Sequence, residues 1–183
     1  MKIGIDISQL AYKNTGVANY LEHLVEWLLK FDKENEYILF YSSLRKKFQI
    51  SNFKLLINNQ ISNFHIKTYP LPPTLLDLLW NRLHICPVEW FIGDVDVFIT
   101  SDWTEPPTIK AKKATILYDL IVYKYPQETD KKIIETQKRK LNWVKQESDM
   151  VFCISQSTKK DAIDILHFDE KKLKVTYPGG PAL

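Results

Sequence analysis

Two short stretches of the sequence pair a carboxylate with an aromatic side chain, a combination that suits a polyhydroxyl ligand. Tyr118 and Asp119 form one pair, and Asp102 and Trp103 form the other. A carboxylate can accept hydrogen bonds from sugar hydroxyls or act as a general base, and an aromatic ring offers an apolar face. Each pair also has a structural interpretation, in which the aspartate caps the turn after a strand and the ring packs in the core.

A third candidate is the stretch Thr15-Gly16-Val17-Ala18-Asn19, where a polar loop leads into a helix-forming sequence. Free backbone N–H groups and the helix dipole favour an anion at such a helix start. A glycine there lets a ligand approach the backbone closely, although a plain turn glycine is the alternative. The chain has no G-x-G-x-x-G after its first strand and no G-x-x-x-x-G-K-[ST], which argues against dinucleotide and P-loop sites.

The hydroxyl and imidazole groups give weaker signals. Ser155, Ser157 and Thr158 lie together, but no G-x-S-x-G surrounds them, and capping of the following helix explains Ser155. The histidines are dispersed without the spacing of metal ligands, so we expect no metal site. They are His23, His65, His84 and His167.

Size and composition indicate one soluble globular domain. The chain has 183 residues, of which 45% are hydrophobic and 26% are charged, and its formal net charge is 25 − 22 = +3. This charge is too small to indicate a nucleic-acid partner. Cys86 and Cys153 each lie in an apolar run, which favours buried free thiols and a reducing compartment. Because no signal peptide and no membrane span are recognisable, we expect a cytoplasmic protein.

Strands and helices must alternate to position the candidate residues. The sequence predicts strands over residues 2–7, 36–41, 64–69, 94–100, 114–118, 150–154 and 172–177, with a short strand over 53–57 as a further possibility. It predicts helices over residues 17–30, from a Thr74 cap to 83, from 129 or 130 through 144, and over 156–166. The pattern is typical of an α/β fold with a doubly wound, mostly parallel, Rossmann-like sheet.

In such a sheet the loops that follow the strands share one edge. The predicted loops at residues 8–15, 101–110 and 119–130 contain or adjoin Thr15, Gly16, Asp102, Trp103 and Asp119. Ligands of doubly wound sheets bind outside the carboxyl ends of the central strands. We therefore expect these residues to meet at one edge, with the strand at residues 2–7 near the centre of the sheet.

The chain resembles the N-terminal half of the family-4 glycosyltransferases, retaining enzymes of two-domain GT-B fold. The resemblance covers essentially the whole chain, and its motifs are individually weak but fairly specific in this order and spacing. They are Lys2-Ile3-Gly4-Ile5-Asp6, Thr15-Gly16-Val17-Ala18-Asn19-Tyr20, Leu79-Trp80, Asp94-Val95-Asp96-Val97-Phe98, Pro106-Pro107, Tyr118-Asp119-Leu120, Tyr125-Pro126, Ser148-Asp149, Ile154-Ser155-Gln156-Ser157-Thr158-Lys159-Lys160-Asp161 and Tyr177-Pro178-Gly179.

The resemblance implies roles for particular residues. Thr15 and Gly16 would lie against the diphosphate of the sugar donor. Tyr118 and Asp119 would border the reacting sugar as catalytic residues, with a tyrosine where the family more often has histidine. Ser155 would face the cleft. Asn19, Asp102 and Trp103 complete the expected substrate-binding set, and no metal or other cofactor is implied.

The resemblance also implies partners. They are a nucleotide-sugar donor, a glycan or lipid-linked acceptor, and a donor-binding second domain supplied in cis or in trans. Residues 1–177 would form the Rossmann-like acceptor-side domain and residues 178–183 the start of the linker, as a fragment, a truncated gene product or a subunit of a split enzyme. Such a half would be inactive alone, and its cleft wall would present aromatic rings to solvent. These rings are Tyr12, Trp103, Tyr118 and Tyr123.

Basic residues suggest a peripheral contact with the inner face of a membrane. Arg45-Lys46-Lys47-Phe48 is one cluster, and the helix predicted from residue 129 or 130 carries the other. Its basic residues are Lys131, Lys132, Lys138, Arg139 and Lys140. A solvated charged face is the alternative interpretation.

Two other functional classes remain open from the sequence. One is a non-catalytic binding or interaction module with a glycosyltransferase-like fold. The other is an unrelated α/β enzyme whose cleft lies within this single domain.

Overall fold

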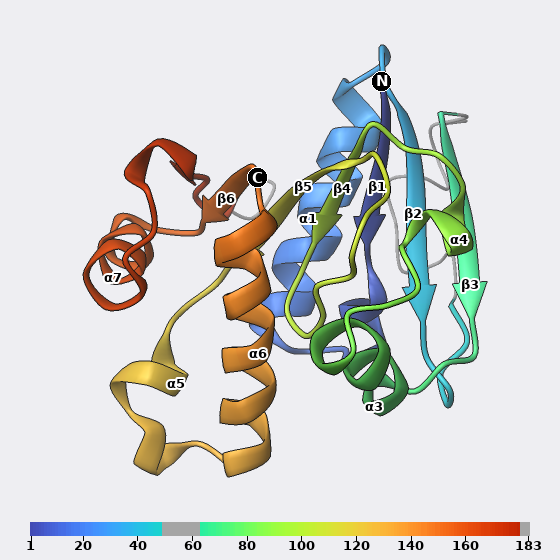
Figure 1. The fold of residues 1–183 in the computed structure, drawn as a ribbon. Helices are drawn as coiled ribbons and strands as arrows, with labels where there is room; N and C mark the ends of the chain where they lie inside the picture. Colours follow the sequence, from blue (N-terminus) through green and yellow to red (C-terminus); the bar gives the residue numbers. More distant parts are fainter. Residues whose placement is uncertain (49–62, 180–183) are drawn as a thin grey trace.

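The computed structural model describes residues 1–48 and 63–179, and these contain a seven-stranded sheet in which every pairing is parallel (Figure 1). The strand order is β3-β2-β1-β4-β5-β6-β7, which is the order of a Rossmann-like doubly wound sheet. The strands are β1 (Lys2–Asp6), β2 (Glu36–Ser42), β3 (Phe64–Tyr69), β4 (Val97–Thr100), β5 (Lys112–Leu117), β6 (Met150–Cys153) and β7 (Leu173–Val175). The predicted fold class is confirmed, while the possible strand over residues 53–57 lies outside the described residues.

Helices cover both faces of the sheet, and the alternation along β2 shows how. Tyr37, Leu39 and Tyr41 pack with α1 (Gly16–Phe31) on one face. Ile38 and Phe40 pack on the opposite face, with residues of α3 (Pro73–Leu76) and α4 (Glu89–Ile92). A strand buried on both faces must be apolar throughout, which is why β2 reads as a continuous run of large hydrophobic residues.

The second half of the chain adds longer helices beside β5, β6 and β7. Leu141 and Val144 of α6 (Lys131–Glu147) pack with Leu117 of β5. Ala162 of α7 (Gln156–Leu166) packs in the same cluster with Val151 of β6. The sequence predicted both helices, because their apolar residues recur at steps of three and four.

The helix predicted from Thr74 to residue 83 differs in its start and its geometry. The chain turns helical at Pro73, with Pro72 in the capping position, because proline fits the first helical turn, where no N–H is needed. From Asp77 to Arg82 it continues as the π-helix η3, and the Leu83 N–H donates to the Leu78 carbonyl five residues back over 3.0 Å.

Several predicted boundaries and faces are also corrected. Residues Ser8–Ala11 form the 3-10 helix η1 within the predicted loop, and the predicted loop at 119–130 holds α5 (Ile121–Lys124) and the 3-10 helix η4 (Pro126–Glu128). The strand predicted over 94–100 begins only at Val97, since the Asp96 carboxylate accepts the Lys2 N–H over 2.7 Å beside it. Glu26, a charged residue within the helix predicted over residues 17–30, is buried.

Candidate functional site

The carboxyl ends of the central strands carry a cleft that joins residues distant in the sequence. Gly16 and Asn19 at the start of α1 line the same hollow as Tyr118 and Asp119 after β5. Its volume is about 920 Å³, and Tyr177-Pro178-Gly179 lies at the same hollow. The parallel strand pairing places these segments on one edge, as predicted.

The start of α1 is open in front of Gly16. Thr15 caps the helix by accepting the Ala18 N–H at Oγ1 over 3.2 Å, while its hydroxyl donates to the Tyr12 carbonyl over 3.0 Å. This cap uses one of the N–H groups expected to face an anion. Gly16 itself is exposed, and a Cβ built on it would meet nothing within 4 Å. The glycine is therefore not required by packing, and the space in front of it is available to a ligand.

Asp119 caps the turn after β5 with only one of its two carboxylate oxygens. Its Oδ1 accepts the Ile121 N–H over 3.0 Å, which is the turn-capping role. The residue is exposed, and its second carboxylate oxygen has no hydrogen-bond partner among the described residues. One oxygen is thus fixed by the backbone, and the other is available to a ligand hydroxyl.

The prediction that Tyr118 is presented to solvent is wrong. Only 8% of Tyr118 is exposed, and its hydroxyl lies 3.0 Å from Ser101 Oγ in a hydrogen bond. Its ring packs edge-on against Tyr20, with 5.5 Å between the centroids. Burial raises the pKa of Tyr118 far above its usual value. Tyr118 therefore supports the floor of the cleft with a neutral phenol. Of the other three rings, Tyr12 is exposed, and Trp103 and Tyr123 are half-buried.

Asp102 lies in an adjoining hollow of about 240 Å³, which Trp103, Tyr118 and Asp119 also line. Gln137 of α6 donates from Nε2 to Asp102 Oδ1 over 2.9 Å and to the Asp102 carbonyl over 3.1 Å. Burial raises the pKa of Asp102, although nearby Lys140 and the Gln137 hydrogen bond oppose this shift. The structure thus brings a second carboxylate to the cleft and holds it in one orientation.

Sequence reasoning missed Lys140, which lies beneath this hollow. Lys140 is 2% exposed, and its ammonium donates to Thr115 Oγ1 over 2.9 Å and to the Ser101 carbonyl. Burial lowers its pKa, and Glu105, Asp102 and Asp6 oppose that shift. One signal in the sequence was its helical spacing, because Lys140 is three residues from Gln137 and four from Val144 on the inner face.

The burial of Lys140 also reduces the basic surface that was predicted on α6. Arg139, next to it, is bonded to Asp77 of η3, with 3.0 Å between Nη2 and Oδ2. The side chains of Lys140 and Arg139 thus face the protein. Of the five basic residues predicted to form a membrane-contacting face on α6, three are exposed. They are Lys131, Lys132 and Lys138.

The Asp77 carboxylate ties η3 to α6 and is expected to make stability depend on pH. Burial raises its pKa, but hydrogen bonds from Asn81, Arg82 and Arg139 outweigh burial, and the pKa lies below its usual value. A lowered folded-state pKa stabilises the protein above the unfolded value of about 4, and this stabilisation is lost as the pH falls through the folded pKa.

Asp77→Asn should therefore lower the free energy of unfolding by about 1 kcal/mol at neutral pH, as for a partly exposed ion pair. The difference from the wild type should shrink as the pH falls towards the lowered pKa of Asp77. Urea unfolding at neutral pH and near pH 3 measures both effects. Asp94→Asn, at an exposed aspartate, is the matched control. A deficit in Asp77→Asn that is equal at both pH values would contradict the prediction.

Ser155 occupies the structural role foreseen for it. Its Oγ accepts the Thr158 N–H over 3.0 Å and so caps α7. Thr158 Oγ1 in turn donates to the Tyr118 carbonyl over 3.0 Å, which links the cap to the cleft floor. Ser155 does not line the hollow that Gly16 and Asp119 share, whereas its neighbour Ile154 does.

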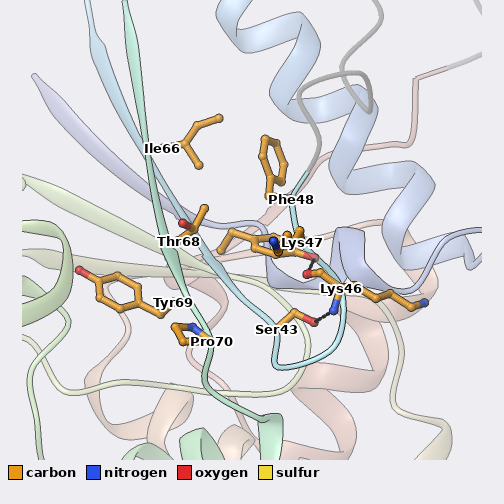
Figure 2. Close-up of a pocket in the computed structure, with 9 residues that line it drawn as sticks. Ser43, Lys46, Lys47, Phe48, Ile66, Thr68, Tyr69 and Pro70 are labelled. Carbon is orange, nitrogen blue, oxygen red and sulfur yellow. Dashed lines mark hydrogen bonds between the residues drawn. The ribbon is translucent and has the colours of Figure 1, made fainter.

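A further hollow of about 540 Å³ lies at the carboxyl ends of β2 and β3. Figure 2 shows the residues that line it. Lys46 lies at its rim, where its N–H donates to Ser43 Oγ over 3.1 Å and its ammonium donates to the Ala11 carbonyl over 2.6 Å. None of the predicted site residues lines this hollow. It shares no lining residue with the hollow of Gly16 and Asp119, so it is not part of the candidate site.

Within residues 1–48 and 63–179, no group of three or more His, Cys, Asp or Glu side chains is arranged to hold a metal ion. The helices in that part of the chain are too short or too polar to cross a membrane.

Comparison with known proteins adds no family. The sequence matches no protein-family model. No curated protein shows significant similarity to it.

Proposed function

We propose that the chain forms the acceptor-side half of a retaining, nucleotide-sugar-dependent glycosyltransferase of GT-B architecture. The observation that carries the proposal is the shared hollow of Gly16 and Asp119, which are more than 100 residues apart in the sequence. A helix start open to an anion and a carboxylate with one free oxygen are the two groups that a sugar diphosphate needs on one wall of a cleft. The motif resemblance in the sequence points to the same reaction.

The roles within this proposal follow from the geometry of each group. The N–H groups at the start of α1 would hold the donor diphosphate, and Asp119 would accept a hydrogen bond from the reacting sugar. Asp102, oriented by Gln137, would meet the acceptor hydroxyls from the adjoining hollow. Tyr118 and Ser155 would stabilise the floor and act through their neighbours, without contact to the reacting atoms.

A polypeptide of residues 1–183 is expected to transfer no sugar by itself. Catalysis in a GT-B cleft requires donor and acceptor to be held together in a site that excludes water, and positioning supplies much of the rate. The hollow on the described residues is one open wall, with a single helix start for the diphosphate. We expect nucleotide-sugar affinity on the order of millimolar at best.

Calorimetric titration with UDP-glucose and GDP-mannose, with and without a donor-binding second domain, tests the proposal. Tight binding and transfer should appear only in the two-domain protein. Turnover by residues 1–183 alone that Asp119→Asn abolishes would overturn the proposal and favour a single-domain enzyme. Binding of neither nucleotide sugar in any form would favour a non-catalytic module.

A further inference from the structure

A smaller hollow of about 220 Å³ lies next to the one that holds Asp102. It lies between the loop after β1, the start of α3, the loop after β4 and the first turns of α6. Trp103 and Ile133 line both this hollow and the one that holds Asp102, so the two are neighbours. The residues that matter for its chemistry are Tyr12, Thr74, Asp77, Trp103, Lys132 and Thr136.

Two aromatic side chains form part of its wall, and the backbone that carries one of them is held in place. Tyr12 is 43% exposed and Trp103 is half-buried, so both retain surface for a ligand. The buried Asn81 fixes the Trp103 segment, because Nδ2 donates to the Trp103 carbonyl over 2.9 Å and Oδ1 accepts the Glu105 N–H over 3.0 Å. A wall fixed before binding costs little conformational entropy when a ligand arrives.

The polar groups of the hollow are largely neutralised. Asp77 accepts hydrogen bonds from Asn81, Arg82 and Arg139, so its charge is already matched. Thr136 Oγ1 accepts from Arg139 Nη2 over 3.1 Å, which leaves its hydroxyl hydrogen free to donate. Lys132 is exposed to solvent, where a charge contributes little to binding. The hollow thus offers aromatic faces and hydroxyls, and little net charge.

We propose that this hollow binds one neutral pyranose ring of the acceptor, with the ring's apolar face against Trp103 and its hydroxyls on Thr136 and Thr74. The assignment rests on the proposed function of the candidate cleft. A sugar ring has the required combination of an apolar face for Trp103 and a hydroxyl edge for the threonines. The volume holds about seven waters at ~30 Å³ each, which suits a single ring better than a nucleotide.

Saturation-transfer NMR on the full chain with methyl glycosides of glucose, galactose and mannose tests the site without a donor. We expect transfer to the ring C–H protons of at least one glycoside, and its loss in Trp103→Ala. Trp90→Ala is the matched control, because Trp90 is 70% exposed on α4 and outside the hollow. Thr136→Val keeps the side-chain shape and should weaken glycoside binding by about threefold to tenfold, the effect of one hydrogen bond.

The site is overturned if no glycoside shows transfer, or if transfer is equal in Trp103→Ala and the wild type. Binding of uridine that requires Trp103, with no glycoside bound, would also overturn it in favour of a nucleobase site. The proposed function fails separately, if Gly16→Val and Asp119→Asn leave turnover unchanged in a two-domain enzyme. A two-domain protein that binds nucleotide sugar normally but binds none of the glycosides would overturn the pyranose site and leave the proposed function standing.

Discussion

Replacement of Glu105 by alanine is expected to lower the free energy of unfolding by about 3–5 kcal/mol, the cost of breaking a buried ion pair. Glu105 has no exposed surface, and its Oε1 lies 3.2 Å from the ammonium of Lys113, whose side chain is 3% exposed. Thr100 also donates its hydroxyl to Glu105 Oε2 over 2.6 Å. The variant leaves a buried ammonium and a buried hydroxyl with fewer partners. Lys113 keeps its ion pair with Glu147 at 2.7 Å, so the lower end of the range is expected.

Urea unfolding followed by tryptophan fluorescence measures the change, which corresponds to about 6–20 °C in Tm for a chain of this size. Glu128→Ala, at an exposed glutamate of η4, is the matched control and should change the free energy of unfolding by less than about 0.5 kcal/mol. The double variant Glu105→Leu/Lys113→Met should recover much of the loss, because a well-packed apolar pair can replace a buried ion pair. A loss below about 1 kcal/mol in Glu105→Ala would show that this pair does not stabilise the core.

Replacement of Gly16 by valine should reduce kcat/KM by about 100-fold in an enzyme completed by a donor-binding domain, comparable to the loss of one oxyanion donor. The branched side chain would occupy the open space before the α1 N-terminus and displace the diphosphate. Folding should be unaffected, because a Cβ at Gly16 meets nothing within 4 Å and valine is no worse than glycine in a helix. Transfer rates and melting temperatures of wild type and variant test both parts.

Gly16→Ala should have an intermediate effect, since its methyl group intrudes less. Asp119→Asn should also cut turnover, by about tenfold or more, as expected for a charge-assisted hydrogen bond in the transition state. Asparagine can still accept the Ile121 N–H, so the turn should persist. Asp164→Asn, at an exposed carboxylate on α7, is the control for loss of charge. Normal rates in both Gly16→Val and Asp119→Asn would remove the cleft assignment.

The sequence by itself determined the strands, the main helices and the edge of the sheet where the candidate residues meet. Continuous apolar runs such as residues 37–41 specify buried parallel strands, and steps of three and four specify α1, α6 and α7. Ser155 was identifiable as a cap because a cap bonds to a backbone N–H only three residues away. The shared edge follows from parallel pairing, since every strand of such a sheet ends on the same side.

Only the tertiary structure decided which side chains from distant segments meet across that edge. Gln137 binds Asp102 from 35 residues away, and Lys140 reaches the Ser101 carbonyl from 39 residues away. In the sequence Lys140 belongs to a run of three basic residues, and for this reason it was expected to be exposed. The packing of α6 against β5 buries it. Likewise Tyr118 ends a predicted strand, a position from which its ring was expected to face solvent. Its hydrogen bond with Ser101 instead holds it beneath the cleft. Local sequence patterns determine the type and the ends of a helix or strand. The contacts that its side chains make depend on which other helix or strand packs against it.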